Sequence, residues 1–184
     1  MRSVGGRASL ARLAAPALVA AALVGGGCGG SGPGPDPQPI ELTVGGAAQD
    51  GSGFVALAGD VTLVPGAQGG FHVWMKYRVT GAPAEMIGLA YTIRRISDGH
   101  LVLTATRQQQ LGPPGDGGYW ELPTAIPAFM CPSPIGVQVR DEPMRFRLDM
   151  STADGAPMAS AEAEFTPHCP DGDQSVFCNN ICSG

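Results

Sequence analysis

The sequence predicts an all-β fold: an immunoglobulin-like antiparallel β-sandwich of about seven to nine strands, followed by a short disulfide-bonded C-terminal helix. The first observation is that apolar and polar residues alternate in several segments between residues 40 and 166, as in strands with one buried face. The second is that Gly, Pro and Asp-Gly pairs separate these segments at short intervals. The third is that this region contains no amphipathic helical pattern of convincing length and no βαβ spacing.

The clearest strand is expected at residues 71–79. Its apolar face is formed by Phe71, Val73, Met75, Tyr77 and Val79, and its other face by His72, Trp74, Lys76 and Arg78. The same alternation predicts the other strands, at residues 40–44, 54–57, 61–64, 87–93, 101–105, 135–139 and 146–150.

Asp154-Gly155 is a strong signal for a two-residue hairpin turn. Such a turn places large apolar residues opposite alanines on the core face, in the pairs Phe146–Ala163, Leu148–Ala161 and Met150–Ala159. On the outer face it brings opposite charges together, in the pairs Arg145–Glu164 and Arg147–Glu162. Because both sets of pairs follow from one register, they support that register independently.

A second hairpin is expected to turn at Asp98-Gly99, with Ile96 opposite Leu101. The alternation fails just before this turn, because Arg94 and Arg95 are consecutive. We therefore predict a β-bulge in which both arginines lie opposite Val102. The bulge restores two further pairs, Ile93–Leu103 and Tyr91–Ala105.

Residues 169–184 are expected to form a separate tail. Asp171 and Asp173 can cap a short helix over residues 174–182, and Gly184 ends it. Cys178 and Cys182 then lie one turn apart on the same face, where a disulfide between them would strain a regular helix.

Four cysteines remain when Cys28 is set aside, namely Cys131, Cys169, Cys178 and Cys182. An even number in an exported protein indicates two disulfides. A metal site is the alternative, but Cys131 and Cys169 lack the paired C-x-x-C spacing that structural zinc favours. The strain argument leaves two connectivities, Cys169–Cys178 with Cys131–Cys182 or the exchanged pairing. We favour the first, and the sequence leaves both open.

The N-terminal residues have the parts of an export signal peptide. Arg2, Arg7 and Arg12 form a cationic start, and residues 13–24 are apolar but shorter than the roughly 20 residues needed to span a bilayer. Three glycines then precede Cys28, and a Gly- and Pro-rich segment follows it. We expect a signal peptide at 1–27, the lipidated cysteine and a flexible tether at 28–39, the sandwich at 40–168, and the tail at 169–184.

A cysteine directly after such a segment resembles the lipobox of bacterial lipoproteins, whose cysteine thiol is acylated and whose amine becomes the new N-terminus. The resemblance implies lipidation of Cys28, and Gly29 resembles the residue found there in lipoproteins sent to an outer membrane. Gly25 departs from the family's pattern, which prefers Leu, so secretion with a free Cys28 is the alternative. The tether favours anchoring, because a soluble domain has less need of a spacer.

The mature chain is acidic. Loss of the signal peptide leaves 8 of the 11 basic residues and all 16 acidic residues, a net charge of about −8 with His neutral. This charge argues against nucleic acid or anionic lipid as the main partner. The expected partners are the membrane, through the N-terminal lipid, and another envelope protein or a polymer.

Residues 66–74, Gly-Ala-Gln-Gly-Gly-Phe-His-Val-Trp, resemble a turn and strand of uncharacterised exported lipoproteins from GC-rich bacteria, as do the cysteine-containing residues 177–184. The resemblance implies an exported lipoprotein and brings no activity with it. His72 and Trp74 form a candidate ligand-binding surface, because they share the face opposite the apolar one. The alternative is that another segment covers Trp74, whose N–H then finds a carbonyl, while His72 is simply hydrogen-bonded.

A periplasmic copper carrier is the alternative function. The chain has three histidines, His72, His100 and His168, and six methionines after removal of Met1, which are ligand types that copper favours. His72 and His100 are the candidate ligands. However, His72 and Met75 project to opposite faces of one strand, and no methionine-rich loop occurs. We therefore expect no resident metal or cofactor.

No motif indicates catalysis. Gly51-Ser52-Gly53 lacks the strand–turn–helix context of a nucleophile elbow, and disulfides would consume the thiols. Asp141 and Glu142 precede Pro143 in an expected turn, and no phosphate-binding or dinucleotide motif occurs. We therefore expect a binding or structural protein that is not an enzyme.

Overall fold

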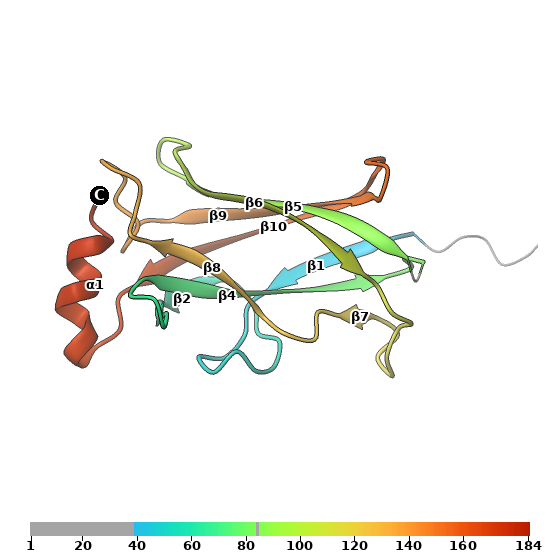
Figure 1. Ribbon diagram of the computed structural model, residues 1–184, viewed down its shortest axis with the longest axis horizontal. Helices are drawn as coiled ribbons and strands as arrows, with labels where there is room; N and C mark the ends of the chain where they lie inside the picture. The colour runs from blue at the N-terminus through green and yellow to red at the C-terminus, as the bar shows by residue number, and fades with distance from the viewer. Residues whose placement is uncertain (1–38, 84) are drawn as a thin grey trace, which may run out of the picture. The chain divides into compact units, whose positions relative to one another are not determined.

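Two β-sheets pack face to face in the computed structural model, which describes residues 39–83 and 85–184 (Figure 1). The predicted signal peptide, Cys28 and all but the last residue of the predicted tether lie outside these described residues. Strand β1 (Glu41–Gly45) begins at one end of the sandwich, and the C-terminal helix α1 (Ser175–Ile181) lies at the opposite end (Figure 1).

Strand β4 (Phe71–Thr80) is the centre of the first sheet. β1 and β3 (Val64–Pro65) pair along one side of it, and β7 (Trp120–Glu121) and β8 (Ile126–Cys131) along the other. The second sheet has the order β2 (Gly59–Thr62), β10 (Pro157–His168), β9 (Met144–Thr152), β5 (Met86–Arg95) and β6 (Leu101–Gln110). The predicted β-sandwich is therefore confirmed.

Two details of the sheets differ from the prediction. The described residues form ten strands rather than seven to nine, because β3 and β7 are separate strands of only two residues each. One strand pairing of this region is parallel, that of β2 with β10, and the other pairings are antiparallel.

The apolar face of β4 lies in the core, as its alternation predicts. Phe71, Val73, Met75, Tyr77 and Val79 are all buried. They belong to one cluster with buried residues of the second sheet, which include Ile87, Leu89, Ile93, Phe146, Leu148 and Met150. This burial of one face from each sheet is the main apolar stabilisation of the sandwich.

The hairpin of β9 and β10 has the predicted register. All three pairs of large residues with alanines and both charge pairs occur, and the ion pairs Arg145–Glu164 and Arg147–Glu162 measure 2.7 and 3.0 Å. The predicted two-residue turn is wrong. Residues 153–155 form the turn, and Met158 is an extra residue in β10 that returns the strands to the predicted register. Gly155 supplies the positive φ, 93°, that such a turn requires.

The bulge in the other hairpin is on the opposite strand from the one predicted. The pairs Ile93–Leu103 and Tyr91–Ala105 occur, but Arg94 pairs with Leu101, so that Val102 is the extra residue. β5 is paired on both sides and runs unbroken against β9 through Arg95, whereas β6 is an edge strand that can bulge outward. The predicted pair Ile96–Leu101 is therefore absent, since residues 96–99 form the turn and the N–H of Arg95 donates to the carbonyl of His100.

Three other predicted strands need correction. Residues 54–57 form a loop with a single bridge, Val55–Gly46, to the chain before it. Residues 61–64 are divided between β2 and β3, which belong to different sheets. Residues 135–139 form no strand, because Gly136 has a φ of 76° and the N–H of Val139 donates to the carbonyl of Cys182 in the tail.

The tail folds into the predicted short helix, in which a 3-10 turn, η1 (Gly172–Gln174), leads into α1. Two disulfides, Cys169–Cys178 and Cys131–Cys182, bind it to the sandwich in the favoured connectivity. The predicted capping is absent, since Asp171 precedes the first turn without a side-chain capping hydrogen bond. Within the described part of the chain, no helix has the length and apolar character needed to cross a membrane.

Candidate functional site

His72 is buried in the outer face of β4, with 4% of its surface exposed. Its ring packs edge-on to Trp74, 4.3 Å between centroids, and against Phe129 of β8 at 5.4 Å. Neither ring nitrogen has a hydrogen-bond partner among the described residues, and burial lowers the pKa of His72. The imidazole is thus a neutral member of an aromatic cluster, and it is neither exposed nor hydrogen-bonded.

Trp74 is half-buried beneath the loop of residues 46–55. Its Nε1–H donates to the carbonyl of Gln49 at 2.9 Å, as expected for the alternative in which another segment covers Trp74. Gly51 lies over the indole with a φ of 81°, and a Cβ there would come within 3.5 Å of Cε2 of Trp74. The left-handed conformation favours glycine at this position, so Gly51 is suited to holding the loop against the ring.

A hollow of about 240 Å³ remains open beside Trp74, and we call it the Trp74 hollow. Its walls are residues 46–49 and 55 of the covering loop, residues 56–58 that follow the loop, Asp60, Val61 and Thr62 of β2, and Val64 and Trp74. Most of these side chains are small and apolar, and Asp60 is the one charged residue among them. The hollow can therefore accept a small group through apolar contacts and backbone hydrogen bonds. Trp74 lines it and His72 does not.

Farther along the same face, the carboxylate of Glu121 joins two cations. Lys76 donates from Nζ to Oε1 at 2.5 Å, and Arg78 from Nε to Oε2 at 2.8 Å. The guanidinium of Arg78 lies between the rings of Phe54 and Tyr119, 4.0 and 4.4 Å from their centroids. The alternation predicts the placement of Lys76 and Arg78, but no spacing in the sequence links Glu121 to them.

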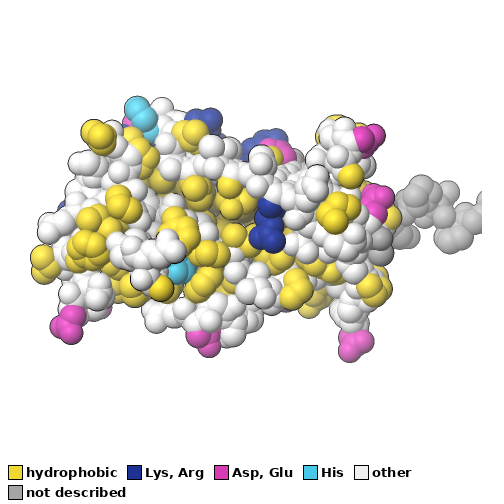
Figure 2. Space-filling view, viewed as in Figure 1, with side chains coloured by type: hydrophobic (Ala, Val, Ile, Leu, Met, Phe, Trp, Pro, Cys, Tyr) yellow, Lys and Arg dark blue, Asp and Glu magenta, His cyan; other side chains and the backbone are white. Residues whose placement is uncertain are grey.

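Exposed apolar side chains gather toward the end of the domain that carries α1. Figure 2 shows hydrophobic groups concentrated on that half of the view, with acidic groups at the margins. The large exposed ones at this end include Phe129, Ile135, Val176 and Phe177. They belong to β8, the segment of residues 132–143 and α1, all of which adjoin the disulfides.

The candidate copper ligands do not meet. His72 belongs to the first sheet, whereas His100 follows the β5–β6 turn of the second sheet, where its Nδ1 lies 2.8 Å from Asp98. In the part of the chain that the structure describes, only the sulfur atoms of Cys169, Cys178 and Cys182 form a group of three possible ligand atoms that all lie within 4.8 Å of one another.

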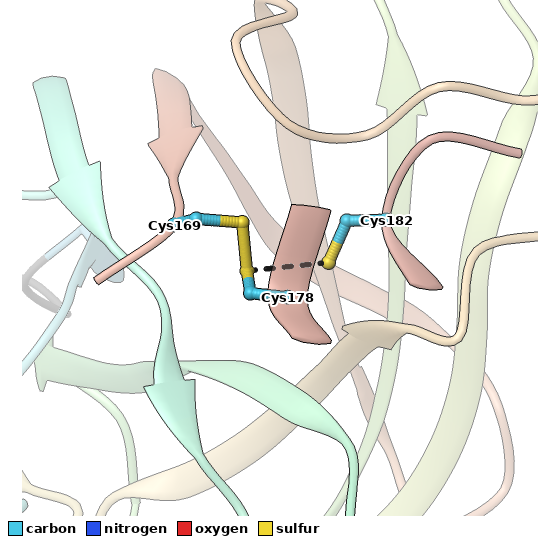
Figure 3. A group of neighbouring side chains, drawn as sticks. All are labelled: Cys169, Cys178 and Cys182. Atoms are coloured by element: carbon cyan, nitrogen blue, oxygen red, sulfur yellow. Dashed lines mark hydrogen bonds between the residues drawn. A yellow bond between two sulfur atoms is a disulfide. The ribbon is translucent and has the colours of Figure 1, made fainter. Parts of the chain in front are cut away.

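These three tail cysteines lie side by side (Figure 3). The sulfur of Cys178, bonded to Cys169, is 3.7 Å from the sulfur of Cys182, which is bonded to Cys131. Cys178 and Cys182 are fully buried. Because disulfide sulfurs are not thiolates, the cluster offers no thiolate ligands to a metal in this state.

A charged cluster surrounds His168 at the end of β10. Nδ1 is 2.7 Å from Oδ1 of Asp141, and Nε2 is 3.0 Å from Oδ1 of Asp60, a contact without the alignment of a conventional hydrogen bond. Asp141 has a φ of 60°, unusual for a non-glycine residue, and its N–H donates to the carbonyl of Pro167. No sequence pattern indicates this cluster, because its residues come from three distant segments.

Comparisons with known proteins identify no family. No protein-family model and no curated protein matches the chain. Among solved structures, the crystal structure of Bacteroides uniformis beta-glucuronidase is similar, with 15% identity and a TM-score of 0.36. The match covers 52% of this chain and 11% of that one, so the chain spans about a tenth of that protein's length.

Proposed function

We propose that this protein is an exported lipoprotein that a lipid on Cys28 holds to the bacterial cell envelope, with the sandwich as a binding or structural module. The supporting observation is that two disulfides pair all four cysteines of the domain. Disulfides persist in oxidising compartments outside the cytosol, which supports export. With these four paired, Cys28 is the one of the five cysteines that the disulfides leave over, as expected for a residue reserved for lipidation.

The proposal is tested on protein taken from the membrane fraction of producing cells. Mass spectrometry should find an N-terminal peptide that begins at Cys28 and carries added lipid mass. Cys28→Ser should lose both the lipid and the membrane attachment, whereas Cys131→Ala/Cys182→Ala should keep both. An unmodified mature N-terminus at any residue other than Cys28 would contradict the proposal. Separation of inner and outer membranes then tests the proposed outer-membrane location.

The binding role is proposed for the Trp74 hollow, with an envelope protein or polymer as the partner. A photoreactive residue at Ala48, in the wall of the hollow, should cross-link to such a partner in cells. The control position is Gln108, which is exposed on β6 of the other sheet. Ala56→Trp should fill the hollow and abolish the adduct. Equal cross-linking from both positions, or from neither, would count against this role.

The copper alternative needs a separate check, because the separation of His72 and His100 offers it no support. Metal analysis of the purified protein provides this check. Stoichiometric copper that disappears when both histidines are changed would replace the binding-module proposal with a copper carrier.

A further inference from the structure

His168 joins three parts of the domain that are distant in sequence. It ends β10, Asp60 belongs to the edge strand β2, and Asp141 lies in the turn that precedes β9. The imidazole thus lies between two carboxylates, 3.0 Å from Asp60 and 2.7 Å from Asp141. A doubly protonated imidazolium can donate to both, since both ring nitrogens then carry hydrogen.

A neutral imidazole cannot hold both carboxylates. It carries one N–H, and the well-aligned partner is Asp141. Asp141 is also held by Nη1 of Arg140 at 2.8 Å, so its charge stays compensated. On loss of the proton, the lone pair of Nε2 therefore faces the carboxylate of Asp60, and the contact with β2 becomes repulsive.

Strand β2 is an edge strand with a sheet neighbour on one side. Among the described residues it pairs only with β10, through the four residue pairs Phe165–Gly59, Thr166–Asp60, Pro167–Val61 and His168–Thr62. Three of its four residues also form a wall of the Trp74 hollow. A weaker contact at Asp60 would thus loosen the strand that closes one side of the hollow.

We propose that His168 is a proton-controlled latch that fixes β2, and with it one wall of the Trp74 hollow, when protonated and releases it when neutral. The latch regulates the same hollow that the proposed function uses for binding. It is nevertheless a property of the domain alone and can be measured without any partner.

The direction of the pH effect follows from the charges around His168. The charged groups that face it are Asp60 from β2 and Asp141 from the turn, and Arg140 shares Asp141. The two carboxylates raise the pKa of His168. The latch is thus closed below the ordinary histidine pKa of about 6.5 and opens as the pH rises through the raised pKa of the folded protein.

Hydrogen exchange of the full mature protein tests the latch. We expect the exchange of residues 59–62, corrected for intrinsic chemistry, to increase roughly two- to five-fold from pH 6 to above the His168 pKa. In the variants His168→Gln and Asp60→Asn, residues 59–62 should exchange fast at every pH, without this increase. His100→Gln is the matched control, because His100 contacts a single carboxylate away from β2 and its loss should keep the step.

An NMR titration makes the test independent of variant folding. The ring signals of His168 and the backbone amides of residues 60–62 should change with one common midpoint in the unmodified protein. The latch is refuted if β2 shows no step at that midpoint, or if Asp60→Asn keeps the step. Either failure would leave the lipidation of Cys28 and the cross-link from Ala48 unaffected, so the two proposals fail separately.

Discussion

At the scale of single residues, Glu121 determines whether the outer face of β4 is electrostatically balanced. Lys76 is only 5% exposed, and its ammonium depends on Glu121 as its ion-pair partner. Burial alone would raise the pKa of Glu121, but hydrogen bonds from Lys76 and Arg78 outweigh it and lower that pKa. The carboxylate therefore stabilises the fold above its ordinary pKa, and this stability is lost as the pH falls through its depressed folded pKa.

Replacing this carboxylate should be costly. Glu121→Gln leaves a buried ammonium without an anion, and we expect the free energy of unfolding to fall by about 2 kcal/mol in urea titrations at neutral pH. Glu164→Gln removes an exposed ion pair with Arg145, which solvent screens, so its cost should be several times smaller. Comparable losses in the two variants would show that Glu121 has no special role.

Trp74 provides a second residue-scale test. Trp74→Phe keeps an aromatic ring but removes the hydrogen bond to Gln49, so unfolding free energy should fall by about 1 kcal/mol. Limited proteolysis should also cut faster within residues 46–55, which the indole holds. Trp120→Phe controls for the smaller ring and should leave this cleavage unchanged. Equal cleavage in all three proteins would mean that the loop is held by other contacts.

At the scale of elements, the sequence predicts strand faces better than strand ends. The pairs of β9 with β10 follow from the alternation because large and small residues, and opposite charges, coincide in one register. The position of the β5–β6 bulge does not follow from the alternation, because it depends on the pairing of β9 with the other side of β5. The region of Val137 and Val139 alternates like a strand, yet the N–H of Val137 donates to the nearby carbonyl of Pro134 and that of Val139 to the carbonyl of Cys182. Cys182 belongs to the tail, a distant partner that periodicity cannot reveal.

The candidate site shows the same limit. The alternation places His72 and Trp74 together on the outer face of β4. It contains no information about the loop that covers Trp74, since residues 46–55 are held by tertiary contacts such as that of Trp74 with Gln49. The cluster of His168 with Asp60 and Asp141 is likewise formed only by the fold.

The two disulfides should contribute unequally to stability. Cys131–Cys182 links residues 51 apart and Cys169–Cys178 links residues 9 apart. Chain entropy of the unfolded state then predicts losses of about 4 kcal/mol for Cys131→Ala/Cys182→Ala and about 3 kcal/mol for Cys169→Ala/Cys178→Ala. Denaturant unfolding of each double variant measures both values, and each variant is the control for the other. A larger loss from the shorter loop would contradict this order.

At the scale of the whole molecule, the net charge of about −8 that the chain would carry after the proposed signal cleavage favours attachment by lipid over attachment by charge. We expect a signal-free chain carrying Cys28→Ser to stay in the supernatant when anionic phosphatidylglycerol vesicles are sedimented at about 0.15 M salt. The lipidated chain should sediment with the same vesicles. Sedimentation of the Cys28→Ser chain would show that the protein surface itself binds the bilayer.

The opposite placement of β1 and α1 has a mechanical consequence (Figure 1). If the molecule is pulled between the proposed lipid and a partner at the α1 end, the load runs along the strands. The hydrogen bonds between β1 and β4 would then be sheared together, which needs more force than opening them one after another. The disulfide Cys131–Cys182 would carry the load covalently from the helix into the end of β8, so the tail would not unravel first.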